Sequence, residues 1–346
     1  MSDAAGPARV LVTGGSGFLG TEICRRLIAR GTQTHSFSRR PSTALARLGV
    51  HQHVGDLVDP AAVSRAVAGC DAVIHTAALA GVSGPARPYW MTNVYGTRNV
   101  LRQCRSHAVR TLVYTSTASV IFHRGGLRYT DESVPYSERY LAAYPRTKAR
   151  AEQLVLAANR PALATCALRP HLLWGPGDPH FLPALRRAVR GRHLFMPGDG
   201  TNLVDTTHLR TAAHAHLLAL DLLHQRQPIG GRPYFITQDD LRPLRVITTL
   251  FLAAVGIPTE WCAVPVRLAH AAAAARETAG HLASSTNRHA LSRFLVAELT
   301  QHRWFDISAA RRSLGFTPPI SFSEGIAELA TGDPTGRNSP PAPSSR

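Results

Sequence analysis

Lysine is almost missing from this chain of 346 residues, because Lys148 is the only one. Every other strong base is an arginine, and the formal net charge is +17. The single ammonium group therefore stands out, and it closes the stretch YPRTK, residues 144–148. The arginines are scattered and are not interleaved with aromatic residues in one basic stripe, which argues against nucleic-acid binding. A peripheral contact with an acidic membrane face or an acidic protein stays open, and salt would weaken it.

Cysteine is also scarce, and no two cysteines form a C-x-x-C pair. The five lie far apart in the chain, at Cys24, Cys70, Cys104, Cys166 and Cys262. This spacing excludes a disulfide framework or a zinc ribbon and favours a reducing compartment, so we expect a cytoplasmic protein. The N-terminal residues MSDAAGPARV lack an apolar run, and charged residues interrupt the apolar stretch 264–282. We therefore expect neither a signal peptide nor a transmembrane span.

Histidine is abundant, with 17 residues, but its spacing does not suit a catalytic metal. The pairs His51/His53 and His214/His216 have no third ligand at metal spacing, and the motif H-E-x-x-H does not occur. The sequence therefore predicts no metal site.

Short strand-like runs alternate with helical stretches along the first half of the chain. Strands are predicted at 8–13, 33–38, 51–57, 70–78, 110–116 and 163–170. Helices are predicted at 17–31, 60–68, 88–107 and 145–159. Strands that alternate with helices form β-α-β units, so we predict an α/β protein with a Rossmann-type, doubly wound parallel sheet.

Glycine and proline break this pattern after residue 175. We predict a dinucleotide-binding Rossmann domain over residues 1–177, to which residues 202–237 return. Residues 178–201 and 238–330 are predicted to form a smaller, mostly helical substrate-binding part. Residues 331–346 are rich in proline and serine and have no apolar anchor, which predicts a flexible tail.

The stretch TGGSGFLG, residues 13–20, joins the first predicted strand to the first predicted helix. It contains both G-x-G-x-x-G and G-x-x-G-x-x-G patterns. Glycines at these positions let the backbone approach a pyrophosphate, whose charge then rests on the helix N-terminus. We therefore predict coenzyme contacts from Gly14, Gly15, Ser16, Gly17, Phe18, Leu19 and Gly20.

The end of the second predicted strand has no carboxylate and carries Arg39 and Arg40 side by side. An acidic residue there would bind the ribose 2′-hydroxyl of NAD, whereas a guanidinium suits the 2′-phosphate of NADP. We predict NADP(H) in preference to NAD(H), with Arg39 as the contact; the alternative is a pair of solvated arginines. Asp56, just past the third strand, is expected either near the adenine or as the cap of its own loop.

Tyr144 and Lys148 are four residues apart and so share one face of a helix, with Pro145 in its first turn. A phenol with a pKa of about 10 is a poor acid-base catalyst at neutral pH, and a neighbouring cation favours the phenolate. A compact ammonium can also donate to ribose hydroxyls, which a flat guanidinium does less well. We predict Tyr144 as the proton donor or acceptor and Lys148 as its activator; the alternative is a chance Y-x-x-x-K pattern.

Six motifs along the chain carry a resemblance to a known family. They are TGGSGFLG, IHTAA (74–78), NVYGT (93–97), YTSTASV (114–120), YPRTK and LRPHLLWGPG (168–177). Through these motifs the chain resembles the extended short-chain dehydrogenase/reductase superfamily, from Val10 to Leu329. Within it the chain resembles the 3β-hydroxysteroid dehydrogenase branch. It is most similar to bacterial 2-alkyl-3-oxoalkanoate reductases of long-chain olefin synthesis, through residues 175–191, 198–208 and 293–306.

This resemblance implies that Thr117 takes the place of the catalytic serine or threonine, with Ser116 one position before it and open to share the role. Further coenzyme contacts are implied for Leu57, Ala77, Ala78, Asn93, Ser116, Tyr144, Lys148 and Pro170. Asn93 is expected to hold the backbone near the site. His75 and His171 are expected near the cleft, either in contact with coenzyme or substrate or as hydrogen-bonded buried histidines.

The resemblance implies an NADP(H)-dependent oxidoreductase that interconverts a ketone and a secondary alcohol at C3 of a large apolar substrate. Reduction of a 2-alkyl-3-oxoalkanoate is favoured, and a 3β-hydroxysteroid or sterol 4-carboxylate is the alternative. A sugar-nucleotide epimerase or dehydratase fits less well, because Ala118 and Ser119 stand where acidic residues would be expected. A non-catalytic NADP-binding regulator would not need Tyr144 and Lys148. By analogy of fold, a homodimer is expected through residues 88–107 and 145–159.

Overall fold

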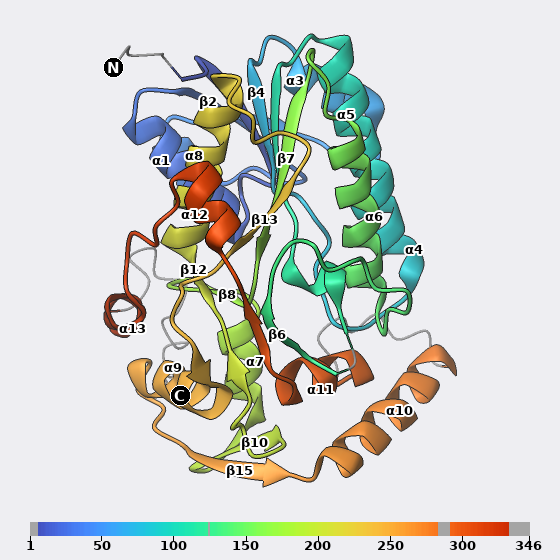
Figure 1. Ribbon diagram of the computed structural model, residues 1–346, viewed down its shortest axis with the longest axis vertical. Coiled ribbons are helices and arrows are strands. Elements are labelled where there is room, and N and C mark those ends of the chain that lie inside the picture. The colour runs from blue at the N-terminus through green and yellow to red at the C-terminus, as the bar shows by residue number, and fades with distance from the viewer. Residues whose placement is uncertain (1–5, 124, 283–290, 332–346) are drawn as a thin grey trace, which may run out of the picture.

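A parallel sheet of seven strands forms the centre of the molecule (Figure 1). The computed structural model describes residues 6–123, 125–282 and 291–331. The strands are β1 (Arg9–Thr13), β2 (Gln33–Ser38), β3 (His51–Val54), β4 (Ala72–His75), β5 (Thr111–Thr115), β7 (Ala164–Pro170) and β13 (Pro233–Ile236). Their order is β13-β7-β5-β4-β1-β2-β3, and every neighbouring pair is parallel. From β1 the chain first adds strands on one side, as β2 and β3, and then on the other side, as β4, β5, β7 and β13. The strand order therefore reverses between β1 and β4, and the predicted doubly wound fold is confirmed.

Helices cover both faces of this sheet, as Figure 1 shows. On one side lie α1 (Phe18–Ala29), α2 (Thr43–Arg47) and α8 (Leu209–His224). On the other lie α3 (Pro60–Val67), α5 (Gly96–Ser106) and α6 (Ala143–Ala157). Successive side chains of a strand point to opposite faces, so Val10 and Val12 pack toward α1 and α8 while Leu11 packs toward α3 and α5. Both faces are thus buried, as a parallel sheet requires.

Several strands end earlier than their sequence predicts. The run predicted at 51–57 ends at Val54, and the run predicted at 70–78 is a strand only from Ala72 to His75. The apolar pattern continues past the last ladder hydrogen bond in each case. As a result the residues that follow these strands lie in loops at the carboxyl edge of the sheet, where ligands bind in this fold.

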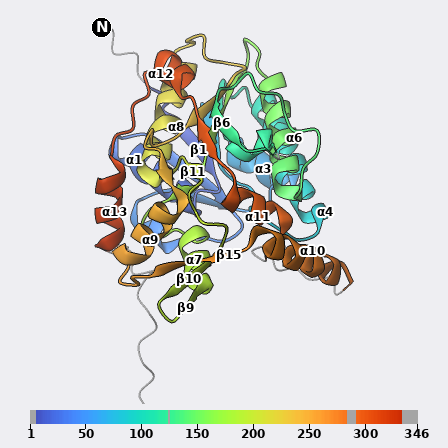
Figure 2. The same cartoon turned by 60° about the horizontal axis from the view of Figure 1, so that its bottom comes forward.

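A smaller part lies beyond that edge, in the lower half of Figure 1 and toward the viewer in Figure 2. Its elements are α7 (Phe181–Ala188), β9 (Val189–Arg190), β10 (His193–Pro197), α9 (Leu244–Ala254), β15 (Glu260–Val264), α10 (Val266–Leu282) and α11 (Arg293–Thr300). Its core contains Trp174, Leu194, Phe251 and Phe322. The last of these opens α13 (Phe322–Ala330), whose start is stabilised by a capping box.

Short strands connect this part to the rest of the chain. One sheet has the order β14-β11-β16-β6, and a second pairs β12 with β8. These strands are β6 (Leu127–Thr130), β8 (Leu173–Trp174), β11 (Leu203–Val204), β12 (Thr207–His208), β14 (Arg242–Pro243) and β16 (Arg303–Phe305). α12 (Ser308–Leu314) packs against α8 and β13 of the main sheet. The expected division of the chain into two parts stays a prediction.

The predicted helix at 88–107 is built from three pieces. A short helix, α4 (Ala86–Tyr89), runs into a π-helical turn, Trp90–Tyr95, which continues as α5. A one-turn 3₁₀ helix, Ala118–Ile121, follows β5. Each helix of the described residues is too short or too polar to cross a lipid bilayer. The predicted flexible tail, apart from Thr331, lies outside the described residues.

Candidate active site

The glycine-rich loop turns the chain from β1 into α1. Gly14 has a φ of 71°, a left-handed conformation that favours glycine, and its N–H donates to the carbonyl of Phe37. A Cβ on Gly20 would stand 2.1 Å from the carbonyl oxygen of Gly14. Only glycine at position 20 therefore lets α1 lie this close to the loop.

The start of α1 suits the phosphates of a dinucleotide. Gly17 is the N-cap residue, and no side chain of the described residues caps the helix there. The first turn carries no acidic residue, so its N–H groups can donate hydrogen bonds to an anion. The N–H of Ser16 donates to the hydroxyl of Ser38 over 3.2 Å, which holds the loop against β2. Phe18 and Leu19 open the helix, and Leu19 is buried.

Two loops at the ends of β2 and β3 hold the residues expected near the adenosine. Arg39 and Arg40 follow β2 and are exposed to solvent. Asp56 follows β3, and its Oδ1 accepts a hydrogen bond from the N–H of Val58 over 3.1 Å, so it caps its own loop. Leu57 is buried next to it, and its carbonyl accepts from the side chain of Asn99.

The loop after β4 is held by Asn93, as expected. The Asn93 side chain both accepts from the N–H of Leu79, over 2.7 Å, and donates to the carbonyl of Leu79, over 3.0 Å. It also donates to the hydroxyl of Thr147 on α6. Ala77 and Ala78 lie between β4 and this anchored residue, and the N–H of Ala77 donates to the hydroxyl of Thr13. Asn93 therefore fixes the loop that follows β4 and links it to α6.

His75 is a hydrogen-bonded buried histidine, which was one of the two alternatives. Its Nδ1 lies 2.6 Å from the hydroxyl of Thr13, and its Nε2 lies 2.9 Å from the hydroxyl of Thr97. Burial, and then the charge of Lys148, lowers its pKa to about 3, so the ring is neutral. His75 thus joins β1, β4 and α5, and its ring nitrogens are already engaged.

The predicted catalytic side chains meet where β5 ends and α6 begins. Thr117 lies two residues past β5, and Tyr144 lies in the first turn of α6. Burial raises the pKa of Tyr144 to about 12, and a hydrogen bond with the Thr117 side chain acts in the opposite direction. Burial outweighs the hydrogen bond with Thr117, and the expected role of Lys148 as the activator of Tyr144 stays a prediction.

Lys148 lies one turn further along α6 and is buried. Its Nζ donates to the carbonyl oxygen of Thr115 over 2.5 Å and lies 4.1 Å from the centre of the Tyr114 ring. Burial lowers the pKa of Lys148 to about 7, although Glu152 acts in the opposite direction. The ammonium is therefore held against the end of β5, within a space that a compact group fills better than a planar guanidinium.

Ser116 and Thr117 are distinguished by their contacts. The N–H of Ser116 donates to the carbonyl of Leu168 on β7, and its buried hydroxyl has no hydrogen-bond partner among the described residues. Thr117 instead contacts Tyr144 and also accepts from the N–H of Ser119. Thr117 is the better placed of the two hydroxyls to act with the tyrosine.

A buried ion pair supports α6 from behind. Arg169 on β7 donates to Glu152 over 2.6 Å, and the hydroxyl of Tyr136 donates to the same carboxylate over 2.7 Å. Pro170 follows Arg169 and is buried at the end of β7. The pair holds β7 against α6, the helix that carries Lys148.

Two charged residues near the tyrosine were not predicted from the sequence. Glu298 on α11 is close enough to raise the pKa of Tyr144, and it pairs with buried Arg303 over 3.2 Å. Burial acts to raise the pKa of Glu298, but Arg303 and His171 together bring it below its ordinary value. His171 also bonds the carbonyl of Asp205 through Nδ1. The resemblance of residues 293–306 to the reductases was the one sequence signal that pointed to this segment.

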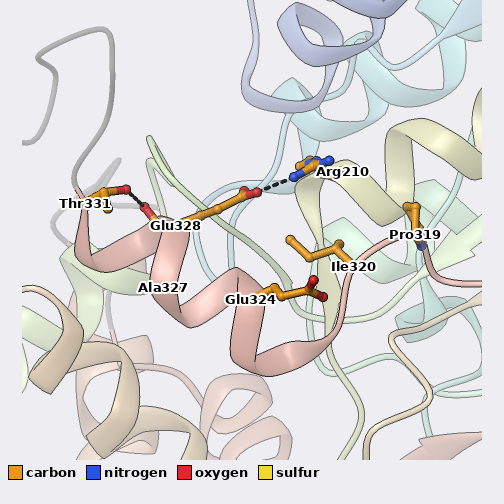
Figure 3. A pocket seen from close by; sticks show the side chains of 7 residues that line it. All are labelled: Arg210, Pro319, Ile320, Glu324, Ala327, Glu328 and Thr331. Carbon is orange, nitrogen blue, oxygen red and sulfur yellow. Dashed lines mark hydrogen bonds and ion pairs between the residues drawn. The ribbon is translucent and has the colours of Figure 1, made fainter.

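The pocket in Figure 3 is lined by residues other than those of the candidate active site. It has a volume of about 360 Å³ and is lined by Arg210, Pro319, Ile320, Glu324, Ala327, Glu328 and Thr331. An ion pair between Arg210 and Glu328 crosses it. None of its lining residues is a predicted site residue, so it is distinct from the candidate active site.

One expectation about histidine is wrong. The pair His51/His53 does have a third candidate ligand, because β2 places His35 beside both residues within the described part of the chain. The available signal was one histidine on β2 and two at alternate positions on β3, and it can be recognised only once β2 and β3 are known to pair.

A glycine-rich β1–α1 loop, with a threonine, a tyrosine and a lysine at the carboxyl edge of a doubly wound sheet, defines an oxidoreductase that uses a nicotinamide dinucleotide. Residues 11–264 match the model of the 3-beta hydroxysteroid dehydrogenase/isomerase family. The chain belongs to this family and is an NAD(P)-dependent oxidoreductase, as the resemblance implied.

Named relatives agree with this assignment. The chain is 44% identical to the 2-alkyl-3-oxoalkanoate reductase of Stenotrophomonas maltophilia, over 93% of this chain and 98% of the relative. It is 32% identical to the decarboxylating sterol-4-alpha-carboxylate 3-dehydrogenase of Mus musculus, over 78% and 75%. Among solved structures, MoeE5 in complex with UDP-glucuronic acid and NAD is 25% identical, with a TM-score of 0.71 over 93% of this chain and 98% of the other.

Proposed function

We propose that the protein is an NADPH-dependent reductase that converts a 2-alkyl-3-oxoalkanoate into the corresponding 3-hydroxy acid. The observation that carries the proposal is the placement of Thr117 just past the end of β5 beside the start of α6, where Tyr144 and buried Lys148 lie one turn apart and Nζ of Lys148 donates to the carbonyl of Thr115. The similarity to a named 2-alkyl-3-oxoalkanoate reductase over nearly the full length of both chains supports this substrate class.

The side chains divide the work of a carbonyl reduction. When bound, the nicotinamide supplies a hydride to the carbonyl carbon. Tyr144, whose raised pKa keeps the phenol protonated at neutral pH, donates a proton to the carbonyl oxygen. Thr117 donates a hydrogen bond to the same oxygen as negative charge develops on it. Lys148 holds a proton at Nζ, which donates to the carbonyl of Thr115 and would also donate to the ribose of a bound coenzyme.

NADPH is the proposed coenzyme because the end of β2 offers exposed guanidinium groups and no carboxylate. An Arg39→Ser variant is expected to raise the KM for NADPH about tenfold and to leave the KM for NADH nearly unchanged, since one charge-assisted contact with phosphate is lost. Arg40→Ser is the matched control, with a smaller change expected. Equal changes for both coenzymes would contradict the role proposed for Arg39.

A substrate panel tests the reaction most directly. Purified protein is mixed with NADPH and either a 2-alkyl-3-oxoalkanoate or a 3-oxosteroid, and with NADP⁺ and a sterol 4-carboxylate. We expect NADPH consumption with the first compound and little turnover with the others. The sterol reaction is the second candidate, because the chain is also similar to a sterol-4-alpha-carboxylate 3-dehydrogenase. Turnover of the sterol alone would overturn the proposed substrate.

Two other functions have weaker support. A sugar-nucleotide reaction is suggested by the likeness to MoeE5, but the residues that follow Thr117 are Ala118 and Ser119 rather than acids. A regulator without catalysis would make the buried ammonium of Lys148 difficult to explain, since burying it opposes its charge.

We also propose a homodimer in the cytoplasm, formed through residues 88–107 and 145–159. Trp90, Met91 and Tyr95 are exposed on the π-helical turn beside α5, although large apolar side chains are usually covered. The described cysteines are all free, as in reducing compartments. Light scattering should give twice the mass of one chain, and a Trp90→Glu change should halve it. A parent protein that runs as a monomer would contradict the dimer.

A further inference from the structure

Three imidazoles gather on the edge of the main sheet, away from the candidate active site. His35 lies on β2, and His51 and His53 lie on β3, the last strand of the sheet. The strands are parallel, with His35 opposite His51 and Phe37 opposite His53. Paired residues share a face, so all three histidines lie on the face that bears α3. We call this group the His35–His51–His53 cluster.

The rings are close enough to share one ion. Their centroids are separated by 4.7 Å for His35 and His51, 5.3 Å for His35 and His53, and 4.8 Å for His51 and His53. One ligand nitrogen from each ring lies within 4.8 Å of the other two. Nδ1 of His35 and Nε2 of His53 are already 3.0 Å apart. Around a tetrahedral ion with bonds of 2.0–2.1 Å, the nitrogens would be about 3.3 Å apart.

The cluster has nitrogen atoms available to a metal. His35 is largely buried, and its Nδ1 faces Nε2 of His53, so a metal ion can take the place of the hydrogen that these two nitrogens share. Burial, followed by the neighbouring rings of His51 and His53 and the charge of Arg9, lowers the pKa of His35 to about 4. Burial and His51 also lower the pKa of His53. Imidazole nitrogens that carry no proton are the atoms that bind a metal ion.

Solvent reaches the cluster from one side. His51 is exposed and His53 is half-buried, whereas His35 lies beneath them. An ion can therefore arrive from solvent, and the exposed His51 ring can turn to shorten its distance to the other nitrogens. The remaining coordination position would be taken by water.

From this geometry we propose that the His35–His51–His53 cluster binds one divalent transition-metal ion, Zn²⁺ in the first instance. Imidazole ligands suit zinc, copper and nickel, whereas magnesium and calcium prefer oxygen. The ion joins β2 to β3 and so anchors the edge strand of the sheet. The loops that carry Arg39 and Asp56 continue from these two strands, but the ion itself lies outside the candidate active site.

Equilibrium dialysis of the untagged full-length chain against zinc chloride tests the site. The parent is expected to bind one Zn²⁺ per chain at the cluster, and a His51→Ala/His53→Ala variant to bind it at least about 100-fold more weakly. His193→Ala is the matched control, because it removes an exposed histidine from β10. That variant should bind zinc as the parent does.

Thermal unfolding provides a second measurement that does not depend on stoichiometry. A ligand that binds only the folded state raises Tm, so zinc should raise Tm of the parent and of His193→Ala. Without zinc, the double variant should unfold close to the parent, which shows that it is folded; with zinc, its Tm should not rise. Equal zinc binding by the parent and the double variant, or no zinc binding by the parent, would overturn the proposal.

Discussion

The sheet and the smaller part below it are packed with different kinds of side chain. The sheet buries aliphatic residues such as Val10, Leu11 and Val73 on its two faces. The smaller part is packed around aromatic rings, and the ring centroids of Trp174 and Phe251 are 4.5 Å apart. Aliphatic packing on the regular strands of the sheet holds the coenzyme loop in place. In the smaller part, which is proposed to bind the substrate, an aromatic cluster from separate segments forms the core. The two functions can therefore be disturbed separately.

Phe251→Ala should have a large effect on the stability of the smaller part and tests whether the two regions can be disturbed separately. The ring is buried between α7, α9 and α13, so its removal should lower the free energy of unfolding by about 3–5 kcal/mol. Urea unfolding gives this value, and NADPH binding to the remaining folded protein should be unchanged.

Leu11→Ala is the matched change in the sheet, at a position that is also fully buried. It should cost about 2–5 kcal/mol and should weaken NADPH binding as well, because β1 carries the glycine loop. If Phe251→Ala weakened NADPH binding as much as Leu11→Ala does, the two regions would not be separable.

Thr117→Ala tests catalysis at the edge of the sheet, where the two regions meet. Loss of the hydroxyl that contacts Tyr144 should lower kcat about 100-fold, within the range found when one donor to a developing oxyanion is removed. Steady-state kinetics of NADPH oxidation measure the change. Ser116→Ala is the control, and it should have a much smaller effect because its hydroxyl does not contact Tyr144; equal losses would mean that the two hydroxyls share the role.

Lys148→Met should change the free energy of unfolding by an amount that depends on pH. In the folded coenzyme-free protein the pKa of Lys148 is about 7, whereas in the unfolded chain it is about 10.4. Between these values the unfolded state binds more protons, so the parent gains stability relative to the variant as pH rises, by up to about 1.4 kcal/mol per pH unit. Below pH 7 the difference should become constant. Urea unfolding across this range tests the slope, and parallel curves would contradict the buried lysine.

Much of the sheet and its coenzyme loop could be predicted from the sequence, because each β-α unit is encoded by neighbouring residues. The turn, the start of α1 and the close contacts of the glycines all arise from residues between Thr13 and Gly20. The ends of strands were placed less well, since the apolar pattern of residues 70–78 continues beyond the last paired residue, His75. Hydrogen bonding to a neighbouring strand, rather than composition, decides where a strand ends.

Properties that depend on distant segments could not be predicted. Glu298 on α11 acts on Tyr144, and Arg303 pairs with Glu298, although both lie more than a hundred residues after Tyr144 in the chain. The pKa of Tyr144 rises because the folded chain buries the phenol, which a Y-x-x-x-K pattern does not report. His35 joins His51 for the same kind of reason, since the pairing of β2 with β3 sets their distance.

Tyr144→Phe, assayed for NADPH oxidation with a 2-alkyl-3-oxoalkanoate, tests the central claim most directly. We expect kcat to fall about 1,000-fold, within the range for removal of a general acid, while NADPH affinity and unfolding remain those of the parent. A Tyr144→Phe enzyme that turns over as fast as the parent would show that Tyr144 is not the proton donor.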